Sequence, residues 1–135
     1  MIVVALAAVA AGCGGGGSDY ANKPRPATPI NVTAAINPDR ISLSPKSFGA
    51  GPIVIIVSNQ TGKAQTVTIE TDELGGEQPG ITQRTDPIEP RGTASLKVDL
   101  REGEYAVSVK GAGVRPAALK VGGERKSAQD ELLEP

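Results

Sequence analysis

Three carboxylates lie close together in this chain, Asp72, Glu73 and Glu77, and they are its best candidates for chemistry. Carboxylate oxygens at such a spacing can hold a hard cation. The spacing does not match a calcium-binding EF-hand loop, and acidic residues are common in exposed loops. Two interpretations therefore stay open for the long loop expected over residues 71–86. We favour a solvated acidic loop, and the alternative is a weak cation site.

The composition of the chain removes most other kinds of chemistry. Its 135 residues include no histidine, one cysteine and one methionine. Histidine is the commonest general base and the commonest transition-metal ligand, so its absence argues against both uses. A single cysteine forms neither an internal disulfide nor a CxxC site. We therefore expect no catalytic residues, no enzymatic activity and no cofactor.

The charge of the chain argues against nucleic acid as a partner. The chain has fourteen Lys and Arg residues and fifteen Asp and Glu residues, which gives a formal charge of −1. Both signs are interspersed along the sequence, without the basic stripe or patch that binds phosphates. The same absence argues against binding of the side chains to an anionic lipid surface.

Residues 1–12 form an uncharged apolar run with the sequence MIVVALAAVAAG. A membrane-spanning helix needs about 20 apolar residues, whereas a run of about 10–14 fits the hydrophobic region of a signal peptide. Ala10, Ala11 and Gly12 precede Cys13, and this stretch resembles the lipobox of bacterial lipoproteins. The resemblance implies that a signal peptide, residues 1–12, is removed and that the Cys13 thiol is diacylated. The lipid would anchor the protein to the cell membrane on its extracytoplasmic side.

The leader differs from the lipobox pattern in two respects. Ala10 stands where leucine is commonest, and no basic residue precedes the apolar run. We therefore expect the natural start to lie upstream of Met1, with a few basic residues there. The alternative interpretation is a buried apolar strand or helix with a free core cysteine. Four glycines directly after Cys13 would continue either element poorly.

The rest of the chain divides into a tether, a folded domain and a tail. Residues 13–29 contain the lipidated cysteine and a stretch rich in glycine and proline, which we expect to be a flexible tether. Residues 30–122 contain short runs rich in β-branched residues, separated by turn residues. Residues 123–135 form a polar tail, which we expect to be frayed or docked on the sandwich, with one amphipathic turn as the alternative.

The folded domain shows the two-residue alternation of half-buried strands, without a helical period of useful length. Residues 53–57 are apolar on both faces and are expected at the centre of a sheet. We predict an all-β fold, a single Greek-key antiparallel β-sandwich of about seven strands. The expected strands are residues 32–36, 40–44, 53–57, 65–70, 94–100, 105–109 and 117–121.

Tyr105 opens one of these strands directly after a glycine-containing turn, residues 101–104. In Greek-key sandwiches such a tyrosine buries its ring and returns its hydroxyl to an upstream backbone group, which is the tyrosine corner. We therefore predict a structural role for Tyr105, in preference to a catalytic one.

Three parts of the folded domain resemble a cupredoxin-like domain. The first is an apolar strand that ends in asparagine, residues 53–59, followed by a turn and another strand. The second is the hairpin of residues 88–96, with its Pro-x-Gly-Thr sequence. The third is residues 100–105, followed by the final strand. The resemblance implies a Greek-key β-sandwich and points to the place of a copper site.

The copper ligands of that family do not carry over to this chain. A type 1 copper site needs two imidazoles and a thiolate, usually with a weak axial thioether. The resemblance places the first histidine at Gln65 and the cysteine at Val109, and the remaining two ligands within residues 110–116. None of these positions holds a ligand of the family, so we expect no blue-copper electron carrier and no metal.

Two functional hypotheses follow. The leading one is a lipid-anchored extracytoplasmic binding or structural module with a degenerate, metal-free cupredoxin-like domain. It would contact an envelope protein through residues 71–86 and 110–116, because end loops commonly carry function. The alternative is an accessory metal-handling lipoprotein, related to metal-uptake systems, with Asp72, Glu73 and Glu77 as its ligands.

Overall fold

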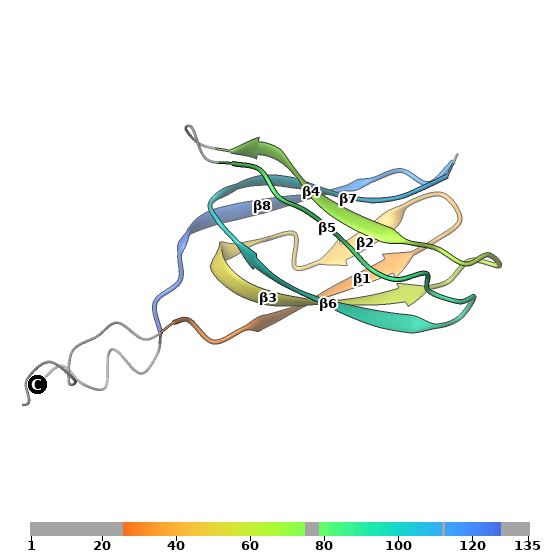
Figure 1. The fold of residues 1–135 in the computed structure, drawn as a ribbon, viewed down its shortest axis with the longest axis horizontal. Helices are drawn as coiled ribbons and strands as arrows, with labels where there is room; N and C mark the ends of the chain where they lie inside the picture. The colour runs from red at the N-terminus through yellow and green to blue at the C-terminus, as the bar shows by residue number, and fades with distance from the viewer. Residues whose placement is uncertain (1–25, 75–78, 112, 128–135) are drawn as a thin grey trace, which may run out of the picture.

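The computed structural model describes residues 26–74, 79–111 and 113–127, and these residues form β-strands and loops (Figure 1). No helix within these ranges is long and apolar enough to cross a membrane. The strands are β1 (Ile30–Ile36), β2 (Ile41–Ser44), β3 (Ser47–Asn59), β4 (Val67–Leu74), β5 (Thr82–Arg84), β6 (Thr93–Leu100), β7 (Gly103–Val109) and β8 (Ala117–Glu124).

The strands lie in two layers that share β3 (Figure 1). One layer has the order β2-β1-β3-β6, and the other has the order β3-β8-β7-β4-β5. The predicted all-β sandwich is confirmed, with eight strands in the described residues where about seven were expected. The additional strand is β5, whose three residues are all exposed and therefore show no alternation in the sequence.

Two strand pairs are parallel, a detail that the predicted antiparallel sandwich did not include. β1 pairs in parallel with β3, from Ile30 opposite Ile53 to Ile36 opposite Asn59. The first residues of β3 also pair in parallel with β8. The reason is that β2 forms an antiparallel hairpin with one edge of β1. β3 then returns in the direction of β1 and pairs with its other edge.

β3 crosses from one layer to the other near its beginning. Residues 47–50 pair with β8, whereas residues 51–58 pair with β6, and the register shifts between Gly49 and Ala50. Gly51 has a φ of 137°, a conformation that glycine adopts without strain. The sequence Gly49-Ala50-Gly51-Pro52 suggests a turn before the strand. In the structure the strand continues through it and bends.

The core consists of the inward rows of both layers. Ile53, Ile55 and Val57 of β3 are buried, and β1 and β6 flank this part of the strand, so the central position is confirmed. Its outer face is less covered than its apolar sequence suggests, because Ile56 is 39% exposed. Each fully buried aliphatic side chain contributes about 2 kcal/mol. The largest fully buried side chains are Tyr105, Ile36, Ile53, Ile55, Ile69, Leu100, Leu119, Val32, Val57, Val67, Val107 and Asn59.

The loops lie at two opposite ends of the sandwich (Figure 1). The terminal end holds residues 26–29, 79–81, 101–102 and 125–127, where the described chain begins and stops. The distal end holds the loops of residues 37–40, 60–66, 85–92 and 110–116. The pairing of β4 with β7 fixes this arrangement, since Leu74 lies opposite Gly103 and Val67 opposite Val109.

Candidate functional site

The acidic candidates lie near the terminal end, and the structure describes them in part. Asp72 is exposed on β4, and the backbone of Glu73 lies opposite Glu104 of β7. The side chain of Glu73 and the whole of Glu77 lie outside the described residues, as does Cys13. Within the described residues no three Asp, Glu, His or Cys side chains come together as metal ligands. The cation site therefore stays a prediction.

Residues 71–74 and 82–84 belong to strands rather than to one long loop over residues 71–86, which corrects the expectation from the sequence. β4 continues to Leu74, and β5 pairs with it. Thr71 holds the residues before β5 against β4, because its N–H donates to the carbonyl of Ile81 at 3.0 Å. Its hydroxyl accepts a hydrogen bond of 2.8 Å from the N–H of Ile81. Residues 71–74 and 110–116 consequently lie at opposite ends of the sandwich and form two separate surfaces.

Asn59 organises the distal end from a fully buried position at the last residue of β3. Its amide nitrogen donates to the carbonyls of Lys63 at 2.7 Å and Ile88 at 2.9 Å. Its amide oxygen accepts hydrogen bonds from Thr61, at 2.9 Å from the N–H and 2.7 Å from the hydroxyl. One side chain therefore joins the 60–66 loop to the 85–92 loop.

Backbone hydrogen bonds extend this linkage to the other distal loops. The backbone of Asn59 exchanges hydrogen bonds with Arg91 and Gly92, and Gln60 donates to the carbonyl of Ile36. Arg115 donates to the carbonyl of Asp39, and its own carbonyl accepts from Ile41. The four distal loops are thus joined in pairs and anchored on the ends of β1 and β3.

The positions at which the resemblance places the copper ligands also lie at the distal end. Gln65 uses its side-chain amide to donate to the Thr61 hydroxyl at 3.3 Å, within the Asn59 network. Val109 is buried in the core and lies opposite Val67. These side chains offer an amide and an alkyl group, whereas a type 1 site requires imidazole and thiolate. The described residues at these positions do not fit a copper centre.

Tyr105 has the geometry of a tyrosine corner. Its side chain is buried, and its hydroxyl donates to the carbonyl of Arg101 at 2.8 Å, four residues upstream. Burial raises the pKa of the hydroxyl above its ordinary value, and the hydrogen bond to Arg101 opposes this shift. Desolvation is the larger of the two effects, so the neutral phenol is favoured in the folded state.

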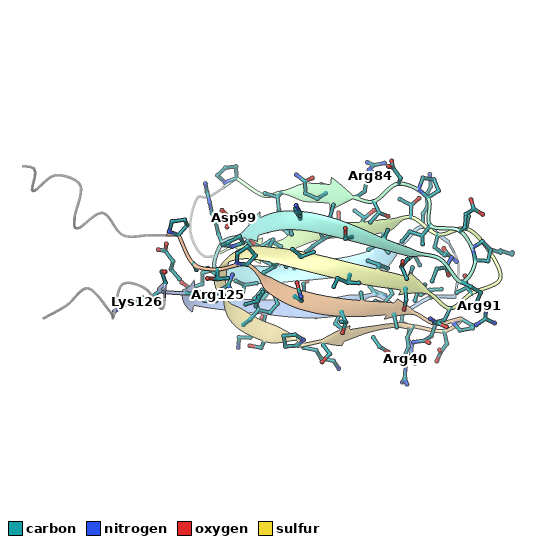
Figure 2. The ribbon with its side chains drawn as sticks, turned by 90° about the horizontal axis from the view of Figure 1, so that it is seen from below. Arg40, Arg84, Arg91, Asp99, Arg125 and Lys126 are labelled. Atoms are coloured by element: carbon teal, nitrogen blue, oxygen red, sulfur yellow. The ribbon has the colours of Figure 1, made fainter. Side chains whose placement is uncertain are left out.

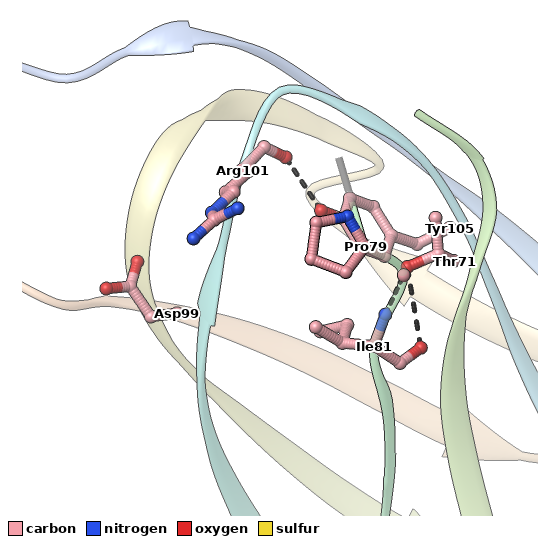
Figure 3. Close-up of a pocket in the computed structure, with 7 residues that line it drawn as sticks. Thr71, Pro79, Ile81, Asp99, Arg101 and Tyr105 are labelled. Atoms are coloured by element: carbon pink, nitrogen blue, oxygen red, sulfur yellow. Dashed lines mark hydrogen bonds between the residues drawn. The ribbon is translucent and has the colours of Figure 1, made fainter. Parts of the chain in front are cut away.

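A pocket of about 270 Å³ lies beside Tyr105 at the terminal end (Figure 3). It is lined by Asp99 and Arg101 from the end of β6 and by Thr71 from β4, together with residues 79–81. The Tyr105 hydroxyl and the Thr71 hydroxyl both face it but are engaged in the hydrogen bonds described above. These two hydroxyls therefore serve the local structure.

Arg125 closes the terminal end, a role that sequence reasoning missed (Figure 2). Its guanidinium donates to three backbone carbonyls, those of Thr28 at 3.1 Å, Ala50 at 3.3 Å and Pro52 at 2.6 Å. The side chain packs over the bend of β3, where a Cβ on Gly49 would come within 2.6 Å of it. Residues 123–125, expected to belong to the polar tail, therefore join the sandwich. In the sequence, Gly49 and Gly51 indicate that another group packs closely against this part of β3.

No protein-family model and no curated protein matches this chain. Auracyanin from Roseiflexus castenholzii is similar, with a TM-score of 0.48 and 16% identity over 73% of this chain and 99% of that one. The multicopper oxidase mgLAC has a TM-score of 0.45 and 12% identity over 72% of this chain and 39% of that one. The copper-containing nitrite reductase of Thermus scotoductus has a TM-score of 0.40 and 10% identity, over 78% and 30%. The likeness to all three concerns the fold alone.

We expect the substitution Asn59→Ala to lower the free energy of unfolding by about 3 kcal/mol, because it leaves several buried polar groups without partners. Urea denaturation followed by circular dichroism measures the change. The control is Asn37→Ala, because the Asn37 amide makes an exposed hydrogen bond to Ser42 at 3.3 Å. It should change stability by less than about 0.5 kcal/mol. Equal losses from the two substitutions would contradict the role given to Asn59.

The substitution Tyr105→Phe should lower the free energy of unfolding by about 1 kcal/mol at neutral pH, the net value of one hydrogen bond. The folded-state pKa of Tyr105 is raised above its ordinary value. Its contribution is therefore complete below about pH 10 and is lost as the pH rises toward the folded-state pKa. Urea midpoints measured from pH 7 to 11 should converge for the two proteins at the alkaline end. A constant difference would contradict this assignment.

Proposed function

We propose that this protein is a lipid-anchored extracytoplasmic module whose cupredoxin-like sandwich supplies a binding or structural surface without a metal. The observation that carries the proposal is the Asn59 network at the distal end. It fixes that end through amide, hydroxyl and backbone groups, at the place where the resemblance locates copper ligands. The loops there are ordered by the protein's own hydrogen bonds.

The distal end has the properties of a preorganised contact surface. Its loops are tied to one another, so little conformational entropy is lost when a partner binds. Exposed charged side chains of both signs lie on it, among them Lys63, Glu89 and Arg91. Asp39 and Arg115 approach each other at 3.8 Å, but both are well exposed and the pair contributes little to stability. This surface suits a polar protein partner of the cell envelope.

The course of the chain supports an arrangement with the distal end remote from the lipid anchor. Arg125 binds the carbonyl of Thr28, so both ends of the described chain lie together at the terminal end. A lipid on Cys13 would be attached to that end through residues 14–25, whose extended length is at most about 40 Å. The distal loops would then lie at the end of the domain opposite the anchor, where an envelope protein can reach them.

The anchor is tested by substituting Cys13 in cells grown with radiolabelled palmitate. The unchanged protein should take up the label and sediment with the membrane fraction, whereas Cys13→Ala should lose both properties. Ser18→Ala, five residues further along the chain, is the matched control and should behave like the unchanged protein. Retention of label and of membrane sedimentation by Cys13→Ala would contradict the proposal.

A further inference from the structure

β6 is a long strand with one unpaired edge. Its eight residues pair with β3 on one side, and no described strand pairs with its other side. Figure 2 shows it at the edge of its layer, beyond β3. The outer strands at the far edges of the two layers are much shorter, four residues in β2 and three in β5. A long open edge is a template for another strand, whereas short edges are protected.

The structure also shows which backbone groups of β6 point to the open edge. Pro52 lies opposite Asp99, has no N–H, and directs its carbonyl away from β6 to Arg125. The pair of Pro52 with Asp99 is therefore not hydrogen-bonded, and antiparallel pairs alternate. It follows that Ile53 and Val98 form a hydrogen-bonded pair. The outward-pointing N–H and C=O groups are those of Thr93, Ser95, Lys97 and Asp99.

The side chains of β6 present a separate pattern on each face. Leu96 and Val98 belong to the inner row and are only partly buried, although they pack against the core. Lys97 and Asp99 belong to the outer row and are exposed. Within the described residues Asp39 forms an ion pair with Arg115, whereas neither Lys97 nor Asp99 forms one. The edge thus combines uncovered apolar surface with two opposite charges spaced two residues apart.

We infer that β6 pairs with β6 of a second copy of this chain, antiparallel and centred on Val98. In this register Lys97 lies opposite Asp99 of the second copy, and the two-fold symmetry makes the same pair twice. Val98 lies opposite Val98, and Leu96 opposite Leu100. The backbone groups of Lys97 and Asp99 point to the open edge. Lys97 of one copy and Asp99 of the other therefore form a hydrogen-bonded pair. The β2-β1-β3-β6 layer of one copy and that of the second copy become one continuous sheet across the dimer.

The charges of Lys97 and Asp99 favour this register over the alternative registers centred on nearby residues. Centring the pair on Lys97 places two lysines opposite each other, and like charges directly opposite are destabilising. Centring it on Leu96 places Lys97 opposite Ser95 and Asp99 opposite Thr93, which gains no charge pair. Only the pairing centred on Val98 gives two opposite-charge pairs with apolar side chains facing each other on the inner row.

The position of Val98 also makes the dimer compatible with attachment to one membrane. β6 runs toward the terminal end, and Val98 lies two residues before the end of the strand. The two domains would therefore overlap at their terminal ends and extend in opposite directions. Both chains would enter near the centre of the dimer, so the two distal ends stay free. The inference does not depend on lipidation, and its test can fail separately from that of the anchor.

Disulfide trapping tests the register directly. The full chain carries Cys13→Ala, to remove the existing thiol, together with Val98→Cys, and is oxidised in a mild non-ionic detergent. In the proposed pair the two Cα atoms of residue 98 lie about 4.5 Å apart, within the range of a disulfide. Most of the chain should then migrate as a covalent dimer. In the matched variant, Ser95→Cys, the two thiols would be about 20 Å apart and should remain free.

Charge reversal tests the selectivity of the same pairing. Sedimentation equilibrium should show that Lys97→Asp and Asp99→Lys each raise the dimer dissociation constant by about tenfold or more. The double variant restores opposite charges and should return within about threefold of the unchanged protein. Lys120→Asp on β8 is the control for net charge, and circular dichroism checks that every variant is folded. The inference would be overturned if the protein were a monomer at all concentrations, or if charge reversal left the dimer dissociation constant unchanged. Trapping of a dimer through Ser95→Cys instead of Val98→Cys would also overturn it.

Discussion

The buried side chain of Asn59 is the constraint on which the distal end depends. β3 ends there in the core, and the loops on both sides of it direct carbonyl groups inward. A buried carbonyl without a donor costs about 1–3 kcal/mol, and the single amide of Asn59 satisfies those of Lys63 and Ile88. An aliphatic residue at position 59 would fill the space but leave them unpaired. The surface proposed for binding is therefore a consequence of how the sandwich ends.

β3 connects this constraint with the opposite end of the molecule. The same strand that ends in Asn59 begins with the bend at Gly49 and Gly51, over which Arg125 is bound. Arg125 joins the beginning of the described chain to its end, and Asn59 joins the distal loops. One strand, shared by both layers, thus fixes where the described chain begins and ends and where the distal loops lie. In the function we propose, these two ends serve separate purposes, attachment at one and contact at the other.

Alternation of apolar and polar residues predicted most of the strands, because a half-buried strand has one buried and one exposed face. Residues 53–57 were predicted as a central strand because they are apolar on both faces. β5 was missed because all three of its residues are exposed. The parallel pairs were missed because alternation says which face is buried but not which strand is the neighbour. The structural role of Tyr105 was predicted from its place after a turn. The role of Arg125 was not predicted, because its partners are backbone carbonyls up to 97 residues distant in the sequence. Sequence patterns thus report burial better than they report long-range polar contacts.

The central claim is that the whole sandwich, its distal end included, is ordered by its own hydrogen bonds and needs no metal ion. The direct measurement is thermal unfolding of the Cys13→Ala chain, which has no thiol, with EDTA and with Cu²⁺, Zn²⁺, Fe³⁺, Mn²⁺ or Ca²⁺ in turn. The account predicts the same midpoint, within about 2 °C, in every condition. Saturation of one site at 100 times its dissociation constant would add about 2.7 kcal/mol, which raises the midpoint by about 10 °C or more. Such a rise with any one ion would contradict the account.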